Sequence, residues 1–168
     1  MKRENIMTRI LLMSDSHHVK EAMSKAIAKY PDMDFYVHCG DCMVPPEKME
    51  GFIIVAGNLD DPSKYPSEAQ LEIGNFRIWI IHGHHLIKGD SPDYKAIARE
   101  AKQRGYNTVF FGHTHTYYDN TIDGVRLLNP GSVWKTRDSS EICSLMLIEI
   151  EGKKLSVERV NYVTLLFS

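Results

Sequence analysis

The 168-residue sequence contains only three cysteines, Cys39, Cys42 and Cys143. An odd number without the spacing of a secreted scaffold excludes a disulfide framework and favours reduced thiols. Cys39 and Cys42 form a C-x-x-C motif, which in other settings is a redox pair or half of a zinc site. The chain has no second C-x-x-C and Cys39 falls where a strand should end, so a buried structural thiol is the simpler interpretation.

The sequence also lacks an excess of charge and any long apolar run. It has 20 Lys and Arg against 22 Asp and Glu, a formal net charge of −2 at pH 7. This balance gives no general attraction to long polyanions, so we expect no long nucleic acid as partner, whereas a small phosphate ester stays open. The apolar run ILLM near the N-terminus is too short for a signal peptide, and no other run could span a bilayer. We therefore expect no membrane association and a cytoplasmic location.

Internal repeats, linkers and low-complexity stretches are absent as well. The chain is 43% hydrophobic and long enough to bury a core without disulfides. These features predict a single domain over residues 1–168.

The apolar pattern predicts strands and helices in alternation through the first two thirds of the chain. A stripe from Val19 to Tyr30 indicates an amphipathic helix that ends at Pro31. A second helix is predicted to start at Ser91-Pro92, with Ser as N-cap and Pro at the first helical position, and to end at Gly105. Beyond residue 107 the pattern predicts only strands, including a last one over residues 155–163.

Five of the predicted strands are followed at once by side chains that bind metals. These are Asp15 and His17 after the first, Asp41 after the second, Asn58 after the third, His82 and His84 after the fourth, and His113 and His115 after the fifth. In layered α/β folds, ligand-binding groups gather at the carboxyl edge of the sheet. The sequence therefore predicts a metal centre at that edge.

Taken singly, most of these motifs also have ordinary explanations. D-x-H can be a capping Asp and a surface His, and Gly40-Asp41 and Gly57-Asn58 are common turn sequences. Of the histidines in H-G-H-H, at least one should be a ligand, with the others near it or near substrate. G-H-T-H is stronger, because two imidazoles two residues apart can point at one metal or bridge two, although two loop histidines can also be exposed and idle. All eight histidines lie in or beside these five segments, and this joint pattern favours the metal centre.

The ordered series D-x-H, GD, GN, H-G-H and G-H-x-H resembles the calcineurin-like metallophosphoesterase superfamily, and the short length resembles its small bacterial and archaeal phosphodiesterase branch. The likeness covers about residues 8–135 and implies an α/β (α+β) fold, a four-layer αββα sandwich of two mixed β-sheets flanked by helices. It also implies two divalent metal ions. The implied ligands are Asp15, His17 and His115 on the first metal, Asn58, His82 and His113 on the second, and Asp41 as the bridge.

The resemblance implies hydrolysis of phosphodiesters, with monoesters as possible further substrates, by a hydroxide that bridges the two metals. Mixed nitrogen and oxygen ligands suit Mn²⁺, which we expect first, with Ni²⁺, Fe²⁺, Zn²⁺ or Mg²⁺ as alternatives. Two such metals, roughly 3.5–4 Å apart, lower the pKa of a shared water and grip the phosphoryl oxygens. No rival nucleophile is evident, so we expect no covalent phospho-enzyme. Asp41, Asn58 and His84 are the residues expected to act in catalysis.

Two positions depart from the pattern of many relatives. Leu59 stands where a His often follows the Asn of the G-N motif and protonates the leaving group or binds phosphate. We hypothesise that protonation is weak here or comes from His84 or water, which favours acidic leaving groups such as aryl esters. His18 stands where a Gly is common, which narrows the mouth of the site.

Several interpretations stay open. Asn129-Pro130-Gly131-Ser132 is either a plain turn or part of a substrate site, and Lys135 and Arg137 either bind an anionic ligand or are solvated. The same fold serves as a protein-interaction scaffold in a retromer subunit that has lost ligand residues, and hydrolysis of an amide or lactone is a third possibility. A homodimer through edge strands or Tyr117-Tyr118 is a further possibility.

Overall fold

The structure is a computed structural model that describes residues 6–88 and 92–167. One sheet contains β1 (Thr8–Met13), β2 (Phe35–His38), β3 (Phe52–Ile54), β9 (Ser144–Glu151) and β10 (Lys154–Asn161). The other contains β4 (Glu68–Ile73), β5 (Phe76–Ile81), β6 (Thr108–Phe110), β7 (Tyr117–Ile122) and β8 (Val125–Pro130). The helices are α1 (Ala22–Lys29), the 3₁₀ turn η1 (Pro46–Met49), α2 (Tyr94–Gln103) and α3 (Tyr162–Phe167).

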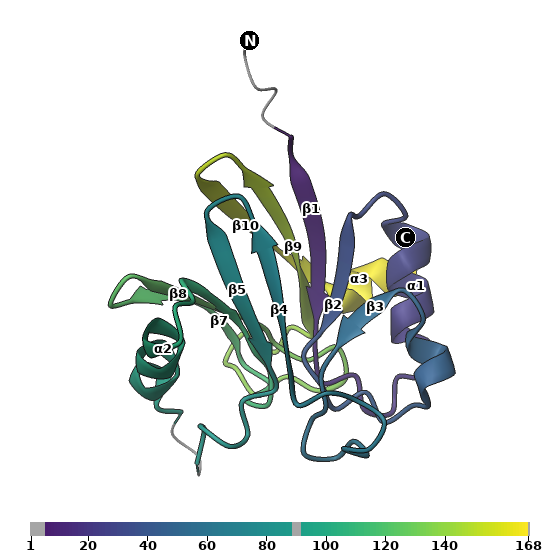
Figure 1. Cartoon of the computed structure of the whole chain (residues 1–168). Helices are drawn as coiled ribbons and strands as arrows, with labels where there is room; N and C mark the ends of the chain where they lie inside the picture. The colour runs from purple at the N-terminus through teal and green to yellow at the C-terminus, as the bar shows by residue number, and fades with distance from the viewer. Residues whose placement is uncertain (1–5, 89–91, 168) are drawn as a thin grey trace.

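The two five-stranded sheets lie face to face, with α1 and α3 on one outer side and α2 on the other (Figure 1). The strand orders are β10-β9-β1-β2-β3 and β4-β5-β6-β8-β7. In the first sheet β1, β2 and β3 are parallel, and in the second β5, β6 and β8 are parallel, while the other pairings are antiparallel. The predicted sandwich of two mixed sheets flanked by helices is confirmed.

Continuous apolar runs arise because the central strands are buried on both faces. Ile10 and Leu12 of β1 point into the core between the sheets, and Leu11 and Met13 point toward α1. β5 alternates in the same way between the central core and α2. Each fully buried Leu, Ile or Met contributes about 1.5–3 kcal/mol relative to an exposed one. This packing fixes the strand ends that carry the site.

The predicted start of the second helix is wrong. α2 begins at Tyr94, and the Asp93 side chain caps it by accepting a hydrogen bond from the backbone N–H of Ala96 at 3.1 Å. Pro92 precedes the helix, and the predicted cap Ser91 lies outside the described residues. An ionised carboxylate is a strong acceptor for the unpaired N–H groups of a helix start, which explains why Asp93 takes this position.

The prediction of strands alone after residue 107 is also wrong, because α3 follows β10. The Asn161 side chain accepts a hydrogen bond from the backbone N–H of Val163 at 3.0 Å, as an N-cap does, and Tyr162 is buried in the core beside α1. Side-chain capping and this anchor favour a helix over a longer strand. No helix within residues 6–88 and 92–167 is long and apolar enough to cross a membrane.

Tyr117 and Tyr118 are partly buried by contacts within the chain. The Tyr118 ring stacks on Tyr94 with ring centroids 3.9 Å apart, and the Arg159 guanidinium lies 4.4 Å from the centre of the Tyr117 ring. These contacts occupy much of the aromatic surface that suggested a dimer contact, and the homodimer stays a prediction.

Candidate metal centre

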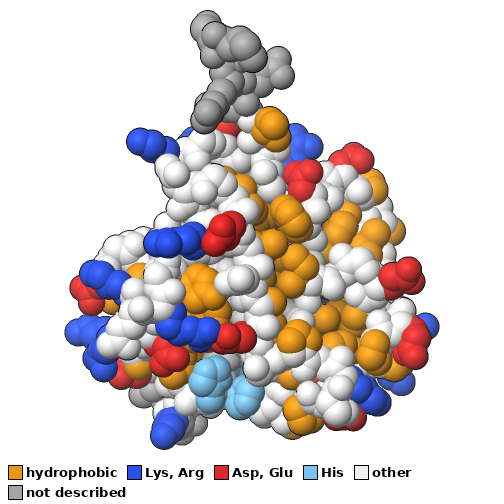
Figure 2. All heavy atoms as spheres, viewed as in Figure 1, with side chains coloured by type: hydrophobic (Ala, Val, Ile, Leu, Met, Phe, Trp, Pro, Cys, Tyr) orange, Lys and Arg blue, Asp and Glu red, His pale blue; other side chains and the backbone are white. Residues whose placement is uncertain are grey.

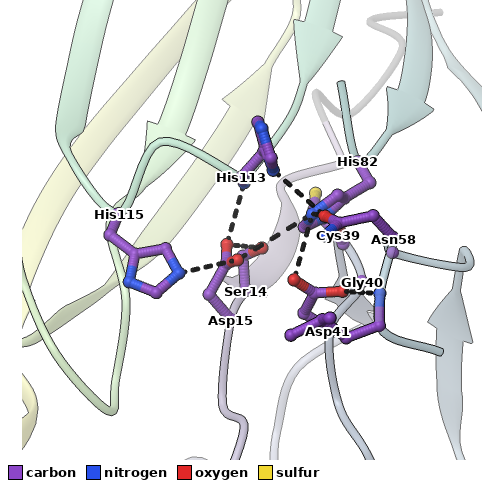
Figure 3. A network of polar contacts seen from close by, with 12 residues as sticks. Ser14, Asp15, Cys39, Gly40, Asp41, Asn58, His82, His113 and His115 are labelled. Atoms are coloured by element: carbon purple, nitrogen blue, oxygen red, sulfur yellow. Dashed lines mark hydrogen bonds and ion pairs between the residues drawn. The ribbon is translucent and has the colours of Figure 1, made fainter. Parts of the chain in front are cut away.

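The predicted ligands come together where the parallel strands of both sheets end (Figure 3). The loops after β1, β2 and β3 bring the ligands of one sheet, and the loops after β5 and β6 bring those of the other. The first set is Asp15, His17, Asp41 and Asn58, and the second is His82, His113 and His115. Histidine side chains also reach the surface at the lower end of the view in Figure 2.

The loops reverse direction sharply at the ligands themselves. Five of the eight non-glycine residues with positive φ among the described residues are predicted ligands: Asp15, His17, Asp41, His113 and His115. Left-handed backbone at non-glycine residues costs about 1–3 kcal/mol each and clusters at functional sites. At these five ligands, the left-handed backbone reverses the chain so that the side chains lie near the ends of the strands.

The first group contains Asp15, His17 and His115. His17 Nε2 lies 3.1 Å from His115 Nε2, and His115 Nε2 lies 3.2 Å from Asp15 Oδ1. His17 Nε2 is 3.7 Å from the same carboxylate oxygen. All three side chains are buried. One ligand atom from each of these side chains lies within 4.8 Å of the others, close enough to share one cation.

The second group contains Asn58, His82 and His113. Asn58 Oδ1 lies 3.0 Å from His82 Nε2 and 3.1 Å from His113 Nδ1. Asp41 Oδ2 lies between the groups, 3.3 Å from His82 Nε2 and 3.8 Å from His17 Nε2. The structure therefore brings all seven predicted ligands together. Asp15, His17 and His115 form one cluster of possible metal donors, and Asp15, Asp41 and His82 form another.

Hydrogen bonds to backbone carbonyls fix how two of the imidazoles face the site. His82 Nδ1 donates to the carbonyl of Cys39 at 2.7 Å, and His115 Nδ1 donates to the carbonyl of Lys135 at 2.8 Å. A neutral ring with its proton on Nδ1 turns the Nε2 lone pair toward the site, as metal-bound histidines do.

A cation fits this arrangement. Asp15 Oδ1 is buried with no hydrogen-bond partner among the described residues, while Asp15 Oδ2 accepts from the Ser14 hydroxyl at 2.6 Å and the His113 backbone N–H at 3.0 Å. A buried carboxylate oxygen without a partner carries a large desolvation cost. The Nε2 atoms of His115 and His17 lie beside this same oxygen, so the three side chains converge on one point where a positive ion would satisfy the carboxylate.

The electrostatics keep both carboxylates and His113 in forms that bind metals, whereas the contacts of His82 with Asp41 and Asp15 outweigh its burial and raise the pKa of His82. Burial opposes ionisation of Asp15, but the imidazoles of His115, His17 and His82 close to the carboxylate outweigh it and hold the pKa of Asp15 well below its usual range. The pKa of Asp41 is likewise lowered, because the contact with His82 outweighs its burial. Burial, with repulsion from His82, lowers the pKa of His113 to about 4. Ionised carboxylates and a neutral imidazole are the ligand forms that metals require.

His84, predicted to act in catalysis, lies beside the second group and outside it. Its ring centroid is 5.4 Å from that of His82 and 6.2 Å from that of His113, and the side chain is exposed. Its position at the edge of the site allows contact with a substrate.

Asp60 positions the bridge between the groups, and its role is not evident from the sequence. Its carboxylate accepts backbone N–H bonds from Asp41 at 2.6 Å, Gly57 at 2.8 Å and Met43 at 2.9 Å. A Cβ added at Gly57 would lie 2.0 Å from Asp41 Oδ1, so only glycine allows this approach. The only signal in the sequence is the position of Asp60 two residues after the G-N motif.

The segment Asn129–Ser132 supports the other side of the site. Asn129 Nδ2 donates to the carbonyl of Gly112 at 2.9 Å and to Thr114 Oγ1 at 3.0 Å, which holds the G-H-T-H loop. The Ser132 hydroxyl donates to the carbonyl of Asp15 at 2.7 Å. This segment is therefore a brace between the loops that carry the first group, which is more than a plain turn.

His38 connects the loops that follow β1 and β2 by hydrogen bonds. Its Nδ1 accepts the backbone N–H of Gly40 at 3.1 Å, so a neutral ring carries its proton on Nε2 and donates to the Ser16 hydroxyl at 3.0 Å. Burial, partly offset by the charge of Asp15, lowers its pKa to about 4. His38 is thus a buried neutral support between the turns of Asp15 and Asp41.

Comparisons with known proteins identify the family of the chain. The family model for the calcineurin-like phosphoesterase superfamily domain matches residues 8–153. The probable metallophosphoesterase YsnB of Bacillus subtilis is 28% identical over 127 residues, which is 74% of each chain.

Solved structures share the fold. A predicted phosphoesterase from Streptococcus pneumoniae has 25% identity and a TM-score of 0.85 over 94% of this chain and 91% of that chain. A structure described as a novel archaeal phosphodiesterase has 23% identity and a TM-score of 0.67 over 91% and 100%. Structures of Vps29, 16–22% identical with TM-scores of 0.68–0.73 and 91–92% of this chain covered, share the fold as well. With its ligand series, its sandwich of two sheets and a family match over most of its length, the chain belongs to the calcineurin-like phosphoesterase superfamily.

Proposed function

We propose that this protein is a divalent-metal-dependent phosphodiesterase that hydrolyses monoesters more slowly. The observation that carries the proposal is the pair of adjoining donor groups with Asp41 between them and a buried, unsatisfied oxygen on Asp15. The family match and the probable metallophosphoesterase relative support it.

Asp15, His17 and His115 would hold one ion, Asn58, His82 and His113 a second, and Asp41 both. When bound, two divalent ions supply Lewis-acid charge neutralisation and a deprotonated water at neutral pH. The mixture of imidazole and oxygen donors suits Mn²⁺, with Ni²⁺, Fe²⁺, Zn²⁺ or Mg²⁺ as alternatives.

The chain's own residues orient the reacting groups. Asn58 and His113 face the open side of the site and would lie against the ester phosphate, whereas Asp15 and His82 lie behind them. His84 stands at the edge, where it could pass a proton to the departing alcohol. The exposed Leu59 side chain offers no proton, so acidic alcohols should leave most readily.

The test combines metal analysis with turnover. Purified protein is loaded with Mn²⁺, Ni²⁺, Zn²⁺ or Mg²⁺ and assayed with bis-p-nitrophenyl phosphate, p-nitrophenyl phosphate, an anilide and a lactone. The Asp41→Asn variant should lose nearly all diesterase activity because the bridging charge is gone, and Asp32→Asn, an exposed Asp far from the site, should keep it. Parental activity in Asp41→Asn would contradict the assignment of the bridge.

The likeness to Vps29 favours a second candidate, a metal-binding or non-catalytic protein-interaction scaffold on the same fold. The two candidates differ in a simple observable. A protein that binds metal in the expected groups but hydrolyses no ester with any of the four ions would be a scaffold.

A further inference from the structure

Exposed apolar side chains gather at the mouth of the candidate metal centre. Of the six large hydrophobic residues that are exposed within the described chain, three line one cavity of about 220 Å³ above the centre: Met43, Leu59 and Trp134. Their side chains are 43%, 55% and 39% exposed. Single exposed apolar residues are ordinary, but a cluster around a polar centre marks a binding surface.

Trp134 forms one side of this rim. Its ring lies 4.7 Å from the His17 ring and 5.2 Å from the His18 ring, measured between centroids. Its backbone N–H donates to the Ser132 hydroxyl at 3.0 Å, and that hydroxyl also holds the Asp15 loop. The backbone of Trp134 is therefore tied to the Asp15 loop, the ring lies beside those of His17 and His18, and more than a third of the residue stays open to solvent.

Leu59 and Met43 form the other side. The Leu59 backbone N–H donates to Asp41 Oδ1 at 2.9 Å, and the Met43 backbone N–H donates to Asp60 Oδ1 at 2.9 Å. Both residues also line a second cavity of about 330 Å³, so the space beside the centre extends past them. The backbone of Leu59 is thus tied directly to the Asp41 carboxylate, and the backbone of Met43 is tied to it through Asp60.

Arg137 is the single Lys or Arg among the residues that line the cavity above the centre. Within the described chain its guanidinium makes no hydrogen bond or ion pair, and its backbone N–H donates to the carbonyl of His115 at 2.9 Å. A free guanidinium next to a metal centre is well suited to a phosphate oxygen.

We infer that Trp134, Leu59 and Met43 bind a flat aromatic ring in the ester group of a phosphodiester that does not leave, which we call the aromatic arm. Arg137 pairs with a phosphate oxygen. This inference rests on the proposed function and deepens it by naming the substrate class. An aromatic ring gains stacking and burial between an indole and aliphatic side chains, and a methyl ester gains little there. The arm is either a phenol-type ring next to the phosphate or the base of a nucleoside.

The first test uses three diesters with the same leaving group: methyl, phenyl and thymidine-5′ p-nitrophenyl phosphate. Because p-nitrophenolate leaves in all three, differences in kcat/KM report on the second arm. We expect the phenyl or the thymidine ester to exceed the methyl ester by about tenfold, the scale of one stacking contact. A phenyl preference identifies an aryl arm, and a thymidine preference identifies a base.

Variants of the residues that line the cavity test whether they cause the preference for an aromatic ester. Trp134→Ala and Leu59→Ala should each reduce the ratio of aromatic to methyl ester toward one, and Trp134→Phe should retain most of it. Val163→Ala removes an exposed apolar side chain on α3 and should leave the ratio unchanged. Equal kcat/KM for all three esters, or an unchanged ratio in both alanine variants, would overturn the inference. Failure to hydrolyse any ester would refute the proposed function instead.

A binding measurement decides the inference even without turnover. Calorimetric titration with phenylphosphonate and methylphosphonate, in the presence of Mg²⁺, should give about tenfold tighter binding of the phenyl compound, and Leu59→Ala should reduce that difference. Equal affinities for the two phosphonates would rule out an aromatic subsite.

Discussion

The two donor groups of the candidate centre differ in how the protein encloses them. Asp15, His17 and His115 are all buried, whereas in the second group only His82 is buried and Asn58 is exposed. Charge interactions are stronger where water is excluded. In the proposed two-metal site, the first group would hold its ion mainly by protein contacts, and the second would share its ion with water and substrate.

The supports of the two groups differ in the same way. The loops of the first group are tied by side chains from other segments, Asn129, Ser132 and His38, all of them buried. The turns that carry Asp41 and Asn58 are tied to each other by the carboxylate of Asp60, which is only partly buried. Because its supporting side chains are all buried, we expect the first group to tolerate the loss of one of them better than the turns of Asp41 and Asn58 tolerate the loss of Asp60.

The largest expected effect separates the groups by removing one ligand from each. His17→Ala takes an imidazole from the buried group, where few waters can replace it, and should lower kcat/KM for bis-p-nitrophenyl phosphate by about a thousandfold, or about 4 kcal/mol. Asn58→Ala removes a neutral, exposed oxygen that water can replace, and should cost about tenfold. Steady-state kinetics with metal analysis measure both.

The control for this pair is His85→Ala, which removes an exposed histidine outside both groups and should change kcat/KM by less than about twofold. Equal losses in His17→Ala and Asn58→Ala would mean that burial does not distinguish the groups.

A second effect, on stability, tests the buried support His38 in the metal-free protein. Burial lowers the pKa of His38 from 6.5 to about 4, so the folded state resists a proton that the unfolded chain takes up. The stability contribution is complete above pH 6.5 and is lost as the pH falls toward 4, by up to about 3 kcal/mol. Denaturant unfolding of the parent and of His38→Asn from pH 7.5 to 4 measures it, because the difference between the two isolates this residue from the neighbouring carboxylates.

The variant should be less stable than the parent at pH 7.5, and the gap should shrink as the pH falls. A constant gap for His38→Asn would show that the ring is not held neutral by the fold.

The ligands could be predicted from the sequence because each directly follows an apolar run, and such runs mark strands buried on both faces whose ends meet at one edge. The side chains that hold the ligand loops in place could not be predicted from the sequence. Asp60 acts by collecting three backbone N–H groups from segments up to 19 residues away, and no residue pattern marks such an acceptor. The left-handed backbone of Asp15 and His113 is likewise imposed by packing, because isolated Asp and His residues rarely adopt it.

The helix α3 could not be predicted because Tyr162 and Val163 continue the apolar run of the preceding strand. The contacts that favour the helix are the Asn161 cap and the burial of Tyr162 against other segments, and a sequence pattern does not show them.

The smallest expected effect concerns Asp60, which supports the turn of Asp41. Asp60→Asn keeps the size of the side chain but replaces one acceptor oxygen by an amide that cannot accept from the N–H groups of Asp41 and Gly57. We expect about a tenfold loss of kcat/KM, the scale of losing a residue that orients a metal ligand, with a larger loss of affinity at the more open second group. Titrating Mn²⁺ into the metal-free protein separates the two affinities. Ser132→Ala removes one of the three buried supports of the first group and should lower kcat/KM less than Asp60→Asn does. The reverse order would show that the buried group is more sensitive to the loss of a support.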